Sequence, residues 1–88
     1  MKLMIIILRD SDSEPVVQEL VRQQFRVTRM TSTGGFLRRG NSTLLVGLED
    51  PQVDAVIALL KKTCRPPDTE NQHRATIFVV NMQQFTTI

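Results

Sequence analysis

The segment Thr31–Asn41 (TSTGGFLRRGN) combines residue types that together suit recognition of a nucleotide. Gly34 and Gly35 let the backbone adopt positive φ angles and approach a ligand closely, and exposed N–H groups in such a turn bind anions. Phe36 offers a flat apolar face for a base, and the two arginines that follow offer charge for phosphate. The alternative is a tight hairpin turn that uses glycine for its conformation alone.

Positive charge is concentrated around this glycine-rich segment. The whole chain has a formal net charge of only +2, but no acidic residue lies between Glu19 and Glu49. The arginines in that interval are Arg22, Arg26, Arg29, Arg38 and Arg39. Arginine makes bidentate contacts with phosphate, so this region is expected to attract an anion. A solvated basic face is the alternative, and it suits Arg22 and Arg29 best.

Length and composition exclude several classes of protein. Eighty-eight residues make one small domain. Cys64 is the only cysteine and His73 the only histidine, so neither an internal disulfide nor a structural zinc site is expected. The apolar run Leu3–Leu8 is too short for a signal segment or a membrane span, which predicts a cytoplasmic protein without membrane insertion. The modest net charge does not favour a nucleic-acid partner.

Hydrophobic periodicity predicts four strands and two helices. The predicted strands are Lys2–Leu8, Phe25–Met30, Ser42–Leu48 and Ala75–Val80. A loop is expected at Asp10–Ser13 and ends in the start of the first helix. Asp12 is the expected cap of that helix, with Pro15 in its first turn. Asp50 is the expected cap of the second helix, with Pro51 at its first position and Cys64 in its apolar stripe. This order predicts an α+β ferredoxin-like βαββαβ fold, a four-stranded antiparallel sheet with two helices on one face.

The predicted strands carry two further signals. The first, third and fourth strands are apolar on both faces, whereas the helices can cover only one, so other copies of the chain are expected to cover the second face. On the second strand, Arg26 and Thr28 point the same way and make a wall suited to phosphate, with ordinary exposed strand residues as the alternative. Gly47 inside the third strand suggests close approach by another group.

The stretches MKLMIIILRDSDS, FRVTRMTSTGGFLRRGNSTLLVGLED, VDAVIALLKKTC and ATIFVV together resemble the PII-like receptors for cyclic di-AMP. The most specific part is Thr33–Asn41, and the resemblance extends over nearly all of the chain except the loop after Cys64 and the tail. It implies a ferredoxin-like protomer, a homotrimer with nucleotide sites between subunits, and a signalling protein that acts on a downstream protein. It implies no enzymatic activity, no metal and no cofactor other than the cyclic di-AMP ligand.

The resemblance also implies a ligand site. Its residues would be Arg26, Thr28, Gly35, Phe36, Leu37, Arg38, Asn41 and Gly47. Phe36 would stack on a base, Asn41 would bind an adenine edge, and Gly47 would contribute backbone from a neighbouring chain.

Two features depart from the family pattern. Only Arg65–Arg74 stands where family members have a long loop. The chain ends in Thr86, Thr87 and Ile88, where the family tends to carry a glutamine beside an aromatic residue.

Several alternatives to this function remain open. The trimer could sense ATP, ADP or AMP, or could be a structural trimer without a ligand. An RNA-binding sheet is disfavoured, because the first and third strands carry no aromatic residue. Arg38 with Asn41 could imitate the anion site of a phosphate-cleaving enzyme, but no paired carboxylates or activated nucleophile support catalysis.

Overall fold

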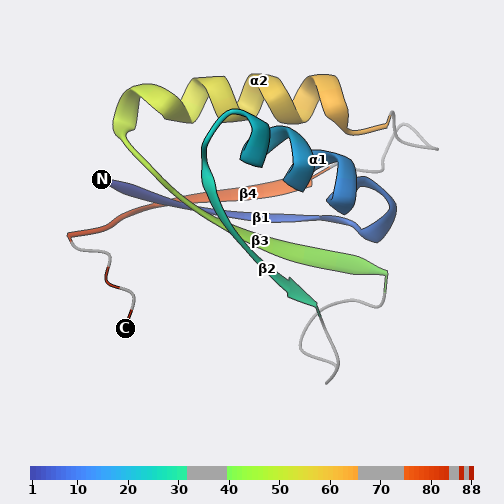
Figure 1. Ribbon diagram of the computed structural model, residues 1–88, viewed down its shortest axis with the longest axis horizontal. Helices are drawn as coiled ribbons and strands as arrows, with labels where there is room; N and C mark the ends of the chain where they lie inside the picture. Colours follow the sequence, from blue (N-terminus) through green and yellow to red (C-terminus); the bar gives the residue numbers. More distant parts are fainter. Residues whose placement is uncertain (32–39, 66–74, 84–85, 87) are drawn as a thin grey trace.

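The computed structural model describes residues 1–31, 40–65, 75–83, 86 and 88. Its elements are β1 (Lys2–Arg9), α1 (Asp10–Arg22), β2 (Arg26–Thr31), β3 (Asn41–Leu48), a 3-10 turn (Asp50–Gln52), α2 (Val53–Thr63) and β4 (Ala75–Asn81). The strands form one antiparallel sheet in the order β2-β3-β1-β4. Both helices lie on the same face of that sheet (Figure 1). The predicted ferredoxin-like α+β fold is therefore confirmed.

The register of the sheet places alternate strand residues beneath the helices. Met4 of β1 pairs with Val46 of β3, and Ile6 pairs with Leu44; all four side chains are fully buried. The helix residues that complete this core are Val16, Leu20, Val56, Leu59 and Leu60, with Cys64 just beyond α2. Burial of each large apolar side chain contributes about 1.5–3 kcal/mol to folding, so this layer is the main source of stability. The predicted core position of Cys64 is confirmed.

The start of α1 differs from the prediction. The helix begins directly after β1, with Arg9 at the N-cap, so no loop separates strand and helix. Asp12 lies inside the first turn and binds Arg9 and Arg65 instead of capping the helix. Pro15 consequently lies within the helix. The prediction was wrong because the partner that holds Asp12 in the helix is 53 residues away along the chain.

The second helical segment begins one residue earlier than expected. Glu49 is the N-cap, and the 3-10 turn that contains Pro51 precedes α2. The backbone N–H of Glu49 donates a hydrogen bond of 2.8 Å to Oε1 of Gln52. A glutamine three residues after an N-cap commonly binds that cap in this way. This hydrogen bond from Glu49 to Gln52 therefore makes Glu49, and not the adjacent Asp50, the N-cap of the segment.

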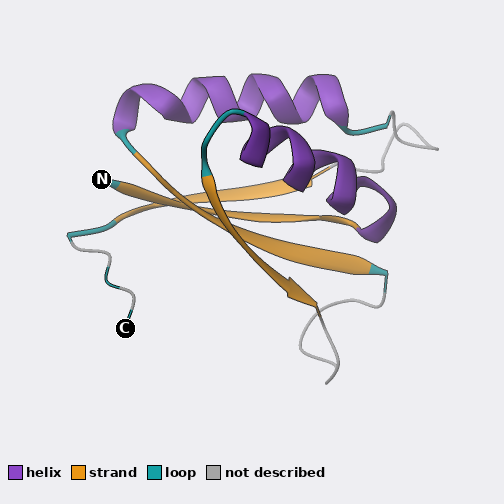
Figure 2. Cartoon of the chain, viewed as in Figure 1, coloured by secondary structure: helices purple, strands orange, loops and turns teal. Residues whose placement is uncertain are grey.

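The face of the sheet opposite the helices, which no helix covers in Figure 2, also carries apolar side chains. Ile5 lies at its centre, between Leu45 of β3 and Phe78 of β4. Phe78 is 51% exposed and Val80 is 46% exposed. We call this surface the open face; its apolar residues are Leu3, Ile5, Ile7, Leu45, Phe78 and Val80. The two-sided apolar character predicted for β1 and β4 is therefore confirmed, whereas Leu45 is the one apolar side chain that β3 presents on this face.

Candidate functional site

A cavity of about 370 Å³ lies on the open face, at the end of the sheet that contains the N terminus. Its volume falls within the range of roughly 300–1,000 Å³ that is usual for small-molecule sites. The cavity is lined by Met1, Leu3, Arg26, Thr28, Leu45, Gly47 and Met82. The sequence predicted three of these, Arg26, Thr28 and Gly47, as ligand-binding residues. We call the lining of this cavity the first half-site.

Pairing between β2 and β3 brings the predicted residues together. Arg26 lies opposite Gly47, and Thr28 lies opposite Leu45. Residues directly opposite each other project from the same face of a sheet, so the exposed Arg26 and Thr28 side chains stand on the cavity wall. A Cβ atom at Gly47 would meet only the Cε atom of Met82, at 3.9 Å. The close approach predicted at Gly47 is thus not made within the described part of this chain, and its backbone is open to a ligand or another subunit.

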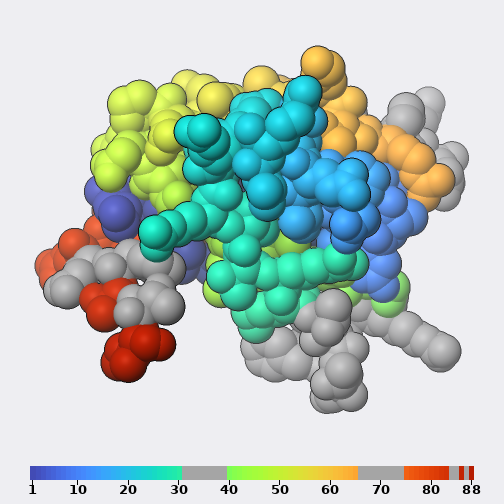
Figure 3. Space-filling view, in the orientation of Figure 1, coloured from blue at the N-terminus to red at the C-terminus, as the bar shows by residue number. Residues whose placement is uncertain are grey.

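Of the arginines in this region that the structure describes, Arg26 is the one left for a ligand. Arg22 pairs with Glu19 at 2.5 Å, and this hydrogen bond lowers the pKa of Glu19 below its ordinary value. Arg29 pairs with Glu14 at 2.8 Å, which bridges β2 and α1 where the two lie side by side (Figure 3). Among the described residues no such acidic partner binds Arg26, and none of the residues that line the cavity is acidic. The first half-site is therefore electropositive.

Asn41 lies far from this cavity. It is the first residue of β3, whereas Gly47 is near the end of that strand. Six residues of extended strand separate their Cα atoms by about 20 Å. Figure 1 agrees: the start of β3 lies at the end of the sheet opposite the N terminus and the C-terminal tail. One chain therefore divides the predicted site into two parts, and we call Asn41 and its surroundings the second half-site.

Four predicted ligand-binding residues, Gly35, Phe36, Leu37 and Arg38, lie outside the described residues. Their roles in stacking and phosphate binding stay predictions.

Sequence reasoning missed four residues of the first half-site: Leu3, Leu45 and, from the two ends of the chain, Met1 and Met82. The backbone N–H of Met82 donates to the carbonyl oxygen of Met1 at 3.0 Å, which continues the pairing of β1 with β4. Met1 and Met82 meet through this pairing of strands from the two ends of the chain, so no local sequence pattern could predict that both line the cavity. Methionine side chains are adaptable and suit the apolar wall of a ligand site.

One expectation about the tail is corrected by the sequence itself. Gln84 directly precedes Phe85, so a glutamine does stand beside an aromatic residue near the C terminus. The departure expected at Thr86–Ile88 is wrong, because those residues follow the glutamine–phenylalanine pair in the chain. Gln84 and Phe85 both lie outside the described residues.

The described ranges show no group of three or more histidine, cysteine, aspartate or glutamate residues arranged to hold a metal ion. The helices in those same ranges are too short or too polar to cross a membrane.

Comparisons with known proteins agree with this geometry. A crystal structure of a functionally unknown protein from Pediococcus pentosaceus is 32% identical in sequence, with a TM-score of 0.76. That match covers 99% of this chain and 96% of the other. The family model described as cyclic-di-AMP receptor, a family of non-enzymatic signalling proteins, matches residues 1–72. The prediction of a signalling protein rather than an enzyme is thereby confirmed, and this chain belongs to the cyclic-di-AMP receptor family.

Proposed function

We propose that this chain binds cyclic di-AMP in clefts between the subunits of a homotrimer. One observation carries the proposal: Arg26, Thr28 and Gly47 line a single cavity, whereas Asn41 lies at the other end of β3. These residues can serve one ligand only if the second half-site comes from a neighbouring chain. Membership of the receptor family supplies the identity of the ligand.

The chemistry of the half-sites supports this ligand. Cyclic di-AMP carries two phosphodiester groups with one negative charge each, which suits Arg26 and the hydroxyl of Thr28. A magnesium-bound triphosphate would instead need carboxylates near the phosphates, and the residues that line the cavity include none. Asn41 presents both a donor and an acceptor, which matches the N6/N7 edge of adenine.

The open face supports the trimer. Three apolar side chains lie side by side across neighbouring strands of this face: Leu45 on β3, Ile5 on β1 and Phe78 on β4. Phe78 is half exposed. Contiguous apolar surface of this kind marks an interaction site in a protein of this size. The cavity lies on the same face, so copies that cover the open face also border the cavity. The interface and the ligand cleft are therefore parts of one surface.

Calorimetry in the presence of EDTA tests the ligand assignment. We expect cyclic di-AMP to release heat and to saturate near one ligand per chain, because each cleft uses one half-site from each of two neighbours. ATP, ADP and AMP, each with and without magnesium, serve as comparison ligands. Heat from magnesium-dependent ATP or ADP binding, with none from cyclic di-AMP, would reassign the protein to adenylate sensing. A trimer that binds none of these ligands would be a structural one.

Substitution of Arg26 by alanine is expected to weaken cyclic di-AMP binding by about 1.5–3 kcal/mol, the usual contribution of a hydrogen bond to a charged group. The salt dependence of the dissociation constant should also decrease, because screening acts on the charge that has been removed. Arg29→Ala is the matched control, since Arg29 lies on the same strand but pairs with Glu14. Equal effects of the two substitutions would argue against a phosphate contact by Arg26.

Mixed trimers test whether each site is shared by two chains. Phe36→Ala alone is expected to cost about 1–3 kcal/mol of binding by loss of base stacking. This proposal assigns Phe36 to the second half-site because it lies five residues before Asn41 in the chain. Arg26→Ala then damages the first half-site and Phe36→Ala the second, so a trimer that contains both kinds of chain retains one intact cleft. We therefore expect co-expression to restore tight binding to a fraction of the sites. Failure of every mixed trimer to bind would indicate that both residues act within one chain.

A further inference from the structure

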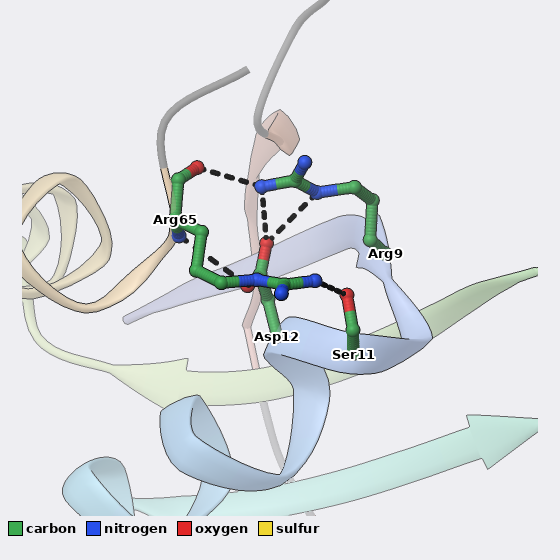
Figure 4. Close-up of polar contacts among 4 residues, drawn as sticks. All are labelled: Arg9, Ser11, Asp12 and Arg65. Atoms are coloured by element: carbon green, nitrogen blue, oxygen red, sulfur yellow. Dashed lines mark hydrogen bonds and ion pairs between the residues drawn. The ribbon is translucent and has the colours of Figure 1, made fainter. Parts of the chain in front are cut away.

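A buried carboxylate at the start of α1 holds two arginines from distant parts of the chain (Figure 4). Asp12 is only 2% exposed. Its Oδ2 atom accepts a hydrogen bond of 3.0 Å from Nε of Arg9 and lies 2.9 Å from Nη2 of the same residue. Its Oδ1 atom accepts a hydrogen bond of 3.3 Å from the backbone N–H of Arg65 and lies 3.4 Å from Nε of that arginine. Both carboxylate oxygens are therefore used.

Two more hydrogen bonds complete this cluster, which consists of Arg9, Ser11, Asp12 and Arg65. Nη2 of Arg9 donates to the carbonyl oxygen of Arg65 at 2.6 Å. Nη2 of Arg65 donates to Oγ of Ser11 at 2.6 Å. Arg65 follows α2 in the chain, so the arginine–aspartate cluster fastens the end of α2 to the first turn of α1.

The same turn of α1 holds the start of β3. The backbone N–H of Asp10 donates to the carbonyl oxygen of Gly40 at 2.8 Å. The fully buried Ser42 donates its hydroxyl hydrogen to the carboxylate of Asp10. Gly40, with a φ of +90° that favours glycine, and Ser42 are the two chain neighbours of Asn41. Asp10 therefore clamps both chain neighbours of Asn41, Gly40 at its backbone carbonyl and Ser42 at its side-chain hydroxyl.

Asn41 needs such a clamp because it lies at the end of the sheet. Its partner in β1 is Arg9, the last residue of that strand. Among the described residues, the pairing of β2 with β3 runs from Arg26 and Gly47 to Thr31 and Ser42. A residue at the end of a strand pairing opens readily unless other contacts hold it. The backbone N–H and the carboxylate of Asp10 supply those contacts from outside the sheet.

We infer that the first turn of α1 positions Asn41 for the ligand, with Asp10 as the positioning residue and Asp12 as the anchor of the turn. The inference rests on the proposed function, which assigns Asn41 to the second half-site. Asp10 acts through the backbone beside Asn41 and not by touching the ligand. Holding a binding group in place before the ligand arrives lowers the ordering cost of binding, so the clamp should increase affinity without adding a ligand contact.

Hydrogen–deuterium exchange of the ligand-free protein, paired with calorimetry, tests the inference. Asp10→Ala is expected to speed exchange in peptides that cover residues 40–44 and to weaken cyclic di-AMP binding by about ten-fold, the effect of losing a hydrogen bond to a charged group. Ser42→Ala should do the same, and the double variant should be no worse than either single one. Asp10→Asn keeps an acceptor for Ser42 and should restore both properties.

Asp54, an exposed aspartate in the first turn of α2, provides the matched control as Asp54→Ala. Unchanged exchange at residues 40–44 in Asp10→Ala would overturn the inference, as would faster exchange with unchanged affinity. If the unsubstituted protein bound no cyclic di-AMP, the proposed function would fail and the ligand role of the clamp with it. The exchange measurement would still decide whether Asp10 orders the start of β3.

Discussion

Substitution of Asp12 by alanine is expected to lower the free energy of unfolding by about 3 kcal/mol. Removing one partner of a buried ion pair usually costs about 3–5 kcal/mol, because it leaves an uncompensated charge behind. The side chain of Arg9 is 18% exposed and would be left in that position. The side chain of Arg65 is 65% exposed and can turn to water, which favours the lower end of the range. Chemical denaturation followed by circular dichroism measures the change.

Two further variants separate the causes of this loss. Asp12→Asn keeps the hydrogen-bond acceptor but removes the charge, so an intermediate loss is expected. Asp54→Ala removes an exposed aspartate from the first turn of α2 and should change stability by less than about 0.5 kcal/mol. If Asp12→Ala lowered the free energy of unfolding by as little as Asp54→Ala, the arginine–aspartate cluster would contribute little to the stability of the fold.

Substitution of Ile5 by glutamate is expected to convert the proposed trimer to monomers. Ile5 lies at the centre of the open face, between Leu45 and Phe78. A carboxylate there stays hydrated in the monomer but would be buried without a partner in each subunit of the trimer, at a cost of several kcal/mol per site. Light scattering at micromolar concentration should give about three times the 10.0 kDa of one chain for the unsubstituted protein and a single chain for the variant.

Val21→Glu is the matched control for this experiment. Val21 is an apolar residue with 58% exposure, and it lies on α1, away from the open face. The control should stay trimeric and bind cyclic di-AMP, whereas Ile5→Glu should lose both properties while keeping its circular dichroism spectrum. A monomeric unsubstituted protein would contradict both the trimer and the shared cleft. An Ile5→Glu trimer would show that the open face is not the interface.

Local patterns were sufficient to predict the fold. The isoleucine-rich β1 is apolar on both faces because it is central in the sheet and borders two apolar surfaces. The helical stripe that includes Val56 and Leu60 identified the side of α2 that faces the core. Both helix starts were less accurately predicted, because Asp12 and Asp50 are good caps in isolation. The backbone N–H of Arg65 decided the first case, and the side chain of Gln52 decided the second.

For the candidate site too, the sequence determined one part and the tertiary structure decided the other. The sequence by itself determined the residue types: the alternation of β2 placed Arg26 and Thr28 on one face, and composition excluded a metal cluster of cysteine and histidine. Only the tertiary structure decided which of them meet. The pairing of β1 with β3 and β4 brings Met1 and Met82 to the cavity beside Gly47, and the length of β3 keeps Asn41 away from it. Strand register joins residues far apart in sequence through backbone hydrogen bonds and the burial of one face, and a local sequence pattern contains neither.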